Sequence, residues 1–329
     1  MISRDPDAVR PGSQTAKRIA GYAAMGAEVT VVLFASLPRF LPVLWRGLTT
    51  VRRGWIVTAQ DPFESGKLAW IIARLRGAKL ELQVHGDFFN PAWAAEAWHR
   101  PLRLALARFR LSNADGVRAV SKRVARSLQD IVPADRITII PVAVQPAAPN
   151  ATPIDASEVR YAGRFTSEKN LSMLIRAFAT AASAHPAARL VLVGDGPEMP
   201  RVRAAIKASG VVDRIRIDPW TNGPAIGAAG IIAIPSLHES WSRLAIEAAL
   251  AGRAIVMTDV GCAGEVIVDG ESGWVVSPGN EAAFAAALTE ALSNPDEARR
   301  RGENARRAAA ALPDAEETAR RIVAAWERL

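Results

Sequence analysis

Two carboxylates, Glu239 and Glu247, lie close together in the stretch 231–252, with seven residues between them. The stretch opens with an apolar, β-branched run that is typical of a buried strand. Ser240 and Ser242 follow it and precede good helix formers, so the pattern predicts a strand, a loop and a helix. Carboxylates accept hydrogen bonds from sugar hydroxyls, whereas the N-terminus of a helix attracts phosphate. The alternative is that both residues are ordinary surface or capping acids.

Two cations, Arg164 and Lys169, occupy a second loop between a predicted strand and a predicted helix. A guanidinium and an ammonium in such a loop can neutralise a departing diphosphate without a metal ion. The alternative for Arg164 is a surface ion pair with Glu168. Together, the carboxylates, the cations and the helix N-terminus form a set of groups that suits a nucleotide-sugar.

Strand-like and helix-like segments alternate along both halves of the chain, which predicts parallel doubly wound sheets of the α/β class. The strands expected in the first half are 28–34, 55–60, 80–85, 116–121 and 137–141, with 1–3 as the tail of a short first strand, and helices include 13–24, 67–76 and 122–131. The strands expected in the second half are 159–162, 190–193, 214–218, 231–234, 254–258 and 273–276. Ligands of such sheets bind beyond the carboxyl ends of the strands, where the polar candidates fall.

The Pro- and Ala-rich run 141–153 carries no charge and is typical of a linker between domains. We therefore expect two Rossmann-like domains, 1–148 for the acceptor and 149–312 for the nucleotide-sugar. A last helix within 313–329 is expected to return to the first domain.

Four segments have the order and spacing of a known family: Ala162-Gly-Arg with Glu168-Lys-Asn, Leu192-Val-Gly-Asp-Gly-Pro-Glu, Pro235-Ser-Leu-His-Glu with Glu247-Ala, and Thr258-Asp-Val-Gly-Cys-Ala-Gly-Glu. In these the chain resembles glycosyltransferase family 4, whose members are retaining enzymes of the GT-B fold. The resemblance covers nearly all of the second half. Gln60-Asp-Pro-Phe-Glu-Ser-Gly and Gln83-Val-His-Gly-Asp-Phe-Phe extend it less specifically into the first half.

The resemblance implies a role for each matching residue of the second domain. Arg164 and Lys169 would hold the donor diphosphate, and Glu239 would contact hydroxyls of the transferred sugar. The peptide N–H groups of 240–242 (Ser240, Trp241 and Ser242) would meet the diphosphate, while Glu247 would accept hydrogen bonds from the ribose.

In the first domain, the resemblance places His85 near the donor sugar and Gly12 in a loop that approaches the donor. The chain departs from the family pattern at a few positions. Ser240 and Ser242 replace two glycines, Gly12 stands where paired glycines are usual, and Cys262 replaces a frequent glycine. None of these changes removes a charged site residue, so activity is expected.

The expected reaction is metal-independent transfer of a hexosyl-type sugar to a hydroxyl of a glycan or lipid-linked acceptor, with retention at the anomeric carbon. No cofactor is expected, since the nucleoside-diphosphate-sugar is a substrate, and the sequence shows no cluster of metal ligands. Two alternatives stay open: a non-catalytic sugar-nucleotide-binding partner of another transferase, and a GT-B epimerase of UDP-sugars.

The net charge of +8 is unevenly distributed along the chain. Residues 1–150 carry 21 Lys and Arg against 11 Asp and Glu, whereas residues 151–329 carry 20 against 22. This surplus, with the basic and aromatic segments 38–55 and 93–110, favours contact between the first domain and an anionic membrane surface. The alternative is helices packed on their own sheet with a solvated Arg face. No nucleic-acid-binding motif is present. The single cysteine and the absence of an apolar leader favour the cytoplasm, at the inner face of the membrane.

Overall fold

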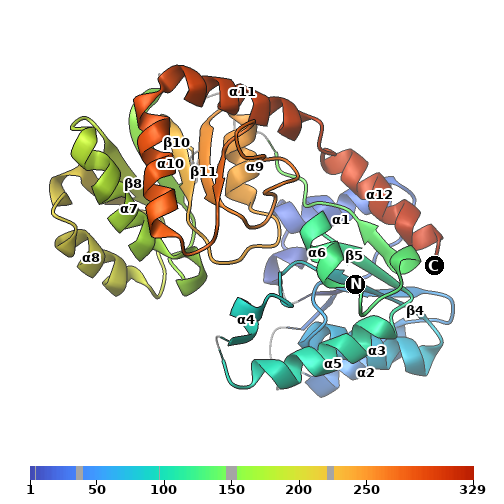
Figure 1. Cartoon of the computed structure of the whole chain (residues 1–329). Coiled ribbons are helices and arrows are strands. Elements are labelled where there is room, and N and C mark those ends of the chain that lie inside the picture. Colours follow the sequence, from blue (N-terminus) through green and yellow to red (C-terminus); the bar gives the residue numbers. More distant parts are fainter. Residues whose placement is uncertain (4, 35–39, 96, 146–153, 221–225) are drawn as a thin grey trace. The chain divides into compact units, whose positions relative to one another are not determined.

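The computed structural model describes residues 1–3, 5–34, 40–95, 97–145, 154–220 and 226–329. The chain divides into two compact units (Figure 1). The N-terminal unit comprises Met1–Ala143 and Pro313–Leu329, and the C-terminal unit comprises Val144–Leu312. Most of the predicted linker, 146–153, lies outside the described residues.

The N-terminal unit is built on a six-stranded sheet in the order β2-β1-β3-β4-β5-β6, and all of its strand pairs are parallel. The strands are β1 (Ile2–Ser3), β2 (Val32–Leu33), β3 (Ile56–Ala59), β4 (Lys79–Val84), β5 (Gly116–Ala119) and β6 (Ile137–Ile139). The α-helices are α1 (Gln14–Ala24), α2 (Phe40–Thr50), α3 (Glu64–Arg76), α4 (Pro91–Ala95), α5 (Arg100–Ser112), α6 (Lys122–Ser127) and α12 (Ala315–Glu327). Figure 1 shows α2, α3 and α5 on one side of the sheet, and α1 and α12 on the other.

The last helix, α12, completes the hydrophobic core beside α1. Ile322 is fully buried there with Tyr22 and Ile140. The rings of Tyr22 and Trp326 meet edge to face, with centroids 5.1 Å apart, a geometry that aromatic pairs prefer. Residues from the two ends of the chain therefore share one core.

The first strands are shorter than the sequence predicts. Of the expected strand 28–34, only Val32–Leu33 forms β2, because its neighbour β1 offers two residues to pair with. A cavity of about 380 Å³ lies beside Met1, lined by Thr30, Trp55 and other residues. The Met1 ammonium donates to the Thr30 carbonyl at 2.7 Å, and burial lowers its pKa to about 6.

The helix boundaries of this unit also differ from the sequence prediction at two places. Helix α3 begins at Glu64, one turn before the predicted start, because 61–63 form a turn in which Asp61 accepts from the Phe63 N–H. Helix α6 ends at Ser127 instead of Ile131, since its last residues tighten into turns.

The C-terminal unit also contains a six-stranded parallel sheet, in the order β12-β11-β10-β7-β8-β9. The strands are β7 (Asp155–Ala162), β8 (Arg189–Val193), β9 (Ile215–Asp218), β10 (Ala229–Ile234), β11 (Ala254–Thr258) and β12 (Trp274–Val276). The α-helices are α7 (Leu171–Ala184), α8 (Met199–Ala208), α9 (Arg243–Leu250), α10 (Glu281–Ser293) and α11 (Pro295–Ala310). The predicted fold class, two Rossmann-like parallel-sheet domains, is confirmed.

The core of the C-terminal unit follows the predicted helical stripe of α7. Leu171, Leu174, Ile175, Phe178 and Ala182 are all buried against the sheet and α10. This packing fixes α7, and with it the loop that precedes α7. In the part of the chain that the structure describes, no helix has both the length and the apolar character needed to cross a bilayer.

Candidate active site

The strand order of the C-terminal unit reverses between β7 and β10. The chain winds from β7 outward to β9, returns to β10 beside β7, and then winds the other way. Loops that leave such a pair diverge, which opens a crevice at the carboxyl ends of the two strands. The two loops with the predicted charges, 163–170 after β7 and 235–242 after β10, both leave from this point. A backbone hydrogen bond of 2.8 Å from the Leu237 N–H to the Glu168 carbonyl joins them.

Lys169 and Glu239 form an ion pair between these loops, with Nζ 2.7 Å from Oε1. The Ser236 hydroxyl donates to the same carboxylate oxygen at 2.6 Å. The side chains of Lys169 and Glu239 are 23% and 10% exposed, so the pair is largely shielded from water but can still be reached. The structure thus brings together two of the predicted site residues and adds Ser236, which the sequence interpretation missed.

The Glu239 carboxylate is held in its ionised form. Burial by itself would raise the pKa of Glu239, but the charge and hydrogen bond of Lys169 and the hydrogen bond of Ser236 lower it below its ordinary value. The Ser242 hydroxyl also favours ionisation electrostatically, but its oxygen has no hydrogen bond of normal geometry among the described residues. We therefore attribute the lowered pKa to Lys169 and Ser236.

Arg164 presents an exposed guanidinium from a fixed backbone. Its carbonyl accepts a 3.0 Å hydrogen bond from the hydroxyl of Tyr161, which is buried. The alternative pairing with Glu168 does not form, because Glu168 accepts instead from the Thr166 hydroxyl at 2.6 Å. Among the described residues, none pairs with the Arg164 guanidinium, so it is available to an anionic ligand.

The segment 240–242 leads into α9 in an unusual conformation. Ser242 is the N-cap residue, as predicted, but its side chain makes no capping hydrogen bond, and its φ of 63° is left-handed. This backbone region favours glycine, the residue that the family pattern has here. Trp241 is buried, and Gly261 packs on its carbonyl so closely that an added Cβ would lie 2.9 Å from the carbonyl carbon. The first peptide N–H groups of α9 therefore start from a tightly packed turn.

Glu247 lies in the second turn of α9 and is half-buried. Burial raises its pKa, and Arg243, one turn earlier, partly offsets this effect. The contact is long, with 3.4 Å between Arg243 Nη2 and Glu247 Oε1, and Arg243 is mostly exposed. The carboxylate is thus only weakly paired and can accept hydrogen bonds from a ligand. Gly252 follows α9 with a φ of 66°, as its predicted place after the helix requires.

His85 belongs to the N-terminal unit and follows β4. Its Nε2 lies 3.0 Å from the Gln83 side-chain oxygen. The Arg118 guanidinium, which can only donate, lies 3.5 Å from the same oxygen, and Gln83 donates at its other end to Glu81 at 3.2 Å. Gln83 therefore accepts from His85, which fixes the Nε2–H tautomer.

The imidazole of His85 is held neutral. Burial, with the positive charges of Arg118 and Arg18, lowers the pKa of His85 to about 3. Glu81, Gln83 and His85 alternate along β4, so their side chains share one face of the sheet. That alternation was the sequence signal for Gln83, which the sequence interpretation did not use.

Gly12 also belongs to the N-terminal unit, just before the N-cap residue Ser13 of α1. Its φ is 78°, and no atom lies within 4 Å of an added Cβ. The loop is therefore open to solvent on this side. Both Gly12 and His85 lie beyond carboxyl ends of parallel strands, β1 and β4.

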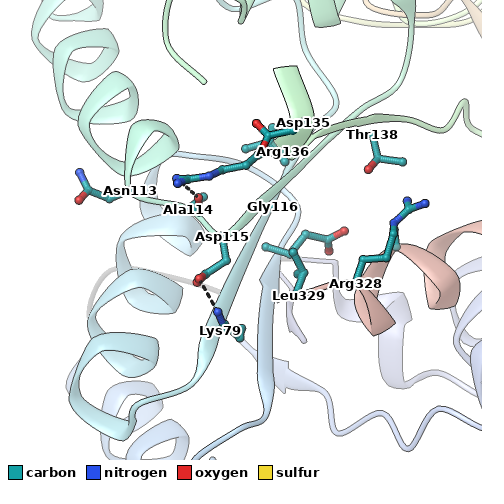
Figure 2. Close-up of a pocket in the computed structure, with 13 residues that line it drawn as sticks. Lys79, Asn113, Ala114, Asp115, Gly116, Asp135, Arg136, Thr138, Arg328 and Leu329 are labelled. Carbon is teal, nitrogen blue, oxygen red and sulfur yellow. Dashed lines mark hydrogen bonds and ion pairs between the residues drawn. The ribbon is translucent and has the colours of Figure 1, made fainter. Parts of the chain in front are cut away.

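A separate pocket of about 400 Å³ lies where β4 and β5 begin, at the end of the sheet opposite His85 (Figure 2). Lys79 and Asp115 form a 3.1 Å ion pair on its wall, and Arg136 donates to the Ala114 carbonyl at 3.4 Å. None of the predicted site residues lines this pocket. Within the described residues there is also no group of three or more His, Cys, Asp or Glu side chains arranged to hold a metal ion.

Comparison with known families matches both halves of the chain. Residues 148–308 match the family model described as glycosyl transferases group 1, and residues 34–143 match the model described as glycosyl transferase 4-like domain. The first match contains the Lys169–Glu239 pair, and the second contains His85.

Similar curated proteins are also glycosyltransferases. A 2-deoxystreptamine glucosyltransferase of Streptomyces kanamyceticus is 27% identical over 68% of this chain, which spans 64% of that relative's length. A 2-deoxystreptamine N-acetyl-D-glucosaminyltransferase of Streptomyces fradiae is 25% identical over 93% of this chain and 77% of its own.

Solved structures share the fold at low identity. A sucrose-phosphate synthase of Thermosynechococcus elongatus superimposes with a TM-score of 0.78 at 20% identity, covering 96% of this chain and 93% of its own. HepE of Anabaena, solved in complex with UDP, gives 0.76 at 18% identity, covering 92% and 86%. The fold is that of GT-B glycosyltransferases, and with both halves matched, the chain belongs to the glycosyl transferases group 1 family of transferase enzymes.

Proposed function

We propose that the protein transfers a sugar from a nucleoside-diphosphate-sugar donor to a hydroxyl of a glycan or lipid-linked acceptor, with retention at the anomeric carbon. The observation that carries the proposal is the Lys169–Glu239 pair at the point where the strand order reverses. A cation for a diphosphate and a carboxylate for sugar hydroxyls are placed side by side there, on two loops held together by a backbone hydrogen bond.

The donor would bind mainly to the C-terminal unit. Arg164 and Lys169 would neutralise the charge that develops on the leaving diphosphate, which is where electrostatic stabilisation contributes most to such a reaction. An ammonium has three N–H donors, so Lys169 can keep Glu239 as a partner and still donate to a phosphate oxygen. The N–H groups at the start of α9 would add further donors, and Glu247 would accept from the ribose hydroxyls.

Glu239 would bind sugar hydroxyls and not act as a proton-accepting base. Its hydrogen bonds from Lys169 and Ser236 both use Oε1, which leaves Oε2 to accept from a hydroxyl. A carboxylate stabilised in this way is a weak base, because its pKa is already lowered. Substitution on the same face through an ion-pair-like transition state therefore suits the site better than a covalent intermediate.

The neutral His85 would serve as a hydrogen-bonding group toward the donor sugar, and the loop at Gly12 would approach the donor from the same unit. We propose no metal or cofactor in this reaction, because the cations of the site would supply the charge that the leaving diphosphate needs. We also propose that the enzyme works in the cytoplasm at the inner face of the membrane.

Donor binding provides the first test. Thermal shifts of the whole chain would be measured with UDP-, GDP- and ADP-sugars, since a ligand at one hundred times its dissociation constant stabilises a protein by about 2.7 kcal/mol. Lys169→Met and Arg164→Gln should each raise at least tenfold the ligand concentration that is needed for a given thermal shift. Arg299→Gln, which changes an exposed arginine of α11, should leave that concentration unchanged. Equal shifts in all variants would remove these residues from the diphosphate site.

Turnover provides the second test. Glu239→Gln and Lys169→Met should each lower turnover by tenfold or more, or about 1.4 kcal/mol of barrier. NMR of the anomeric proton in the product would establish retention, and inversion would overturn the mechanism. Activity that survives EDTA is expected. A donor that is never cleaved, even by water, would favour a non-catalytic partner subunit, and an isomerised UDP-sugar would favour an epimerase.

A further inference from the structure

Large apolar side chains are unusually exposed on the α2–α3–α5 face of the N-terminal unit, defined as the outer surface of these three helices with residue 98 before α5. Their exposures range from 47% for Leu106 to 92% for Trp98. The seven residues are Leu41, Trp45, Leu75, Trp98, Leu102, Leu106 and Phe109. Single exposed apolar residues are ordinary, but a group on one layer marks an interaction surface.

The exposed residues form stripes along the helices. Leu102, Leu106 and Phe109 follow the i, i+4, i+7 spacing along α5, and Leu41 and Trp45 follow the i, i+4 spacing along α2. Residues at these spacings share one side of a helix. The helices contact one another through α3, since the rings of Trp70 and Phe109 meet with centroids 5.6 Å apart.

Helix α5 buries Ala107 and Leu111 but also exposes large apolar side chains. Arg110 is buried and donates to the Pro62 carbonyl at 2.9 Å, and Arg103 forms two 3.0 Å hydrogen bonds to Glu64. Leu102, Leu106 and Phe109 are exposed to water on the same helix. The expected arrangement of a packed helix with a solvated arginine face describes α5 only in part, because Arg108 is exposed whereas Arg110 is buried.

The charge of this face is almost entirely positive. The helices α2, α3 and α5 carry eight Lys and Arg side chains and one carboxylate, that of Glu64. That carboxylate is already paired with Arg103. Arg46, Lys67 and Arg108 are exposed among the apolar stripes. A pocket of about 220 Å³ lies between the helices, with Lys67 and Arg110 on its wall beside Phe40 and Leu106.

We propose that the α2–α3–α5 face binds the surface of an anionic lipid bilayer. Apolar side chains with tryptophans among them suit the boundary between acyl chains and headgroups, and arginines around them suit anionic headgroups. The same positive face on a second copy of the chain would repel this one, so self-association through it is disfavoured. The inference does not depend on the proposed sugar transfer and is tested without it.

The test is co-sedimentation of the full chain with vesicles. Vesicles of phosphatidylcholine alone are compared with vesicles in which about one third of the lipid is phosphatidylglycerol. We expect binding to the anionic vesicles that weakens as salt is raised. A triple variant, Leu102→Gln, Leu106→Gln and Phe109→Gln, should bind at least tenfold more weakly.

Matched control variants distinguish binding through this face from nonspecific hydrophobic binding to the vesicles. Val212→Gln and Trp220→Gln remove exposed apolar residues of the C-terminal unit and should leave binding unchanged. Arg46→Gln with Arg108→Gln should weaken binding severalfold, whereas Arg299→Gln with Arg306→Gln should not. These charge variants change exposed residues only, so they test the face even if the apolar triple variant fails to fold by circular dichroism.

Three outcomes would overturn the proposal: equal binding to neutral and anionic vesicles, binding that the variants of α2 and α5 leave unchanged, and no binding to either vesicle. A chain that is dimeric by light scattering and becomes monomeric in the triple variant would also overturn it, because a second copy would then occupy the face.

Discussion

Lys169→Met should destabilise the C-terminal unit by leaving the Glu239 carboxylate without its cation. Removing one partner of a buried ion pair costs about 3–5 kcal/mol. Here the two side chains keep 23% and 10% exposure, and Ser236 continues to donate, so we expect about 2–3 kcal/mol at neutral pH. Methionine keeps the length and apolar stem of lysine, so the loss of packing is small.

The dependence of this loss on pH follows from the sign of the Glu239 shift. In the wild type the pKa of Glu239 is lowered, so its interactions add stability above its ordinary value of 4.5 that is lost as the pH falls. Without Lys169, burial would raise the pKa, and the ionised carboxylate would cost stability that is relieved as the pH falls. The difference between wild type and variant should therefore be larger at about pH 8 than at about pH 5.

Urea unfolding of the wild type, Lys169→Met, Glu239→Gln and the double variant at both pH values measures this coupling. The double variant should be more stable than Lys169→Met by about 1–2 kcal/mol at the higher pH, because glutamine carries no charge to bury. Equal stability of these two variants, or a difference that does not change with pH, would refute the argument that an unpaired charge dominates the loss.

Three further predictions concern single residues. Ser242→Gly should raise stability by about 1 kcal/mol in urea unfolding, because the φ of 63° is strained for serine; a loss of stability would mean that the serine hydroxyl contributes more than the strain costs. Gly194→Ala should lower stability by more than about 2 kcal/mol, since the added Cβ would lie 1.9 Å from the Gly163 carbonyl oxygen, and a melting temperature close to that of the wild type would contradict this. His85→Gln should flatten the pH dependence of stability below about pH 6.5. The pKa of the wild-type imidazole is lowered to about 3, so only the unfolded chain binds a proton as the pH falls below the ordinary pKa of 6.5. The wild type should therefore lose about 1–2 kcal/mol of stability near pH 5 through this half-buried group. Identical dependence of stability on pH in the wild type and the variant would contradict the neutral state of His85.

The fold was largely predictable because the alternation of apolar runs and amphipathic helices is strong in both halves. The stripe from Leu171 to Ala182 is buried where its helical spacing requires. The exception lies at the edge of the N-terminal sheet, where the apolar run 28–34 forms only a two-residue strand. Such a run does not show how many backbone partners its neighbour supplies, and β1 supplies two residues.

The candidate site was predictable in location but not in its contacts. The rule for parallel sheets places Lys169 and Glu239 at one edge, but only the adjacency of β7 and β10 brings residues 70 positions apart to 2.7 Å. The hydrogen bond from Ser236 depends on the same loop geometry. Ser242 was expected at the N-cap, but its left-handed backbone and the lack of a side-chain cap were not foreseen. Gly261 packs closely against Trp241 and Ser242, a contact between distant positions that the local sequence pattern does not show.

The contribution of α12 to the core of the N-terminal unit bears on how the chain folds during synthesis. Tyr22 and Ile140 are covered by residues that are encoded after the C-terminal unit, among them Ile322 and Trp326. The C-terminal unit ends at Leu312 and is fully synthesised before α12 emerges. Although domains generally fold from the N-terminus onward, here the later-encoded unit can reach its native packing first. Until α12 docks, the earlier-encoded unit would expose the part of its core around Tyr22 and Ile140.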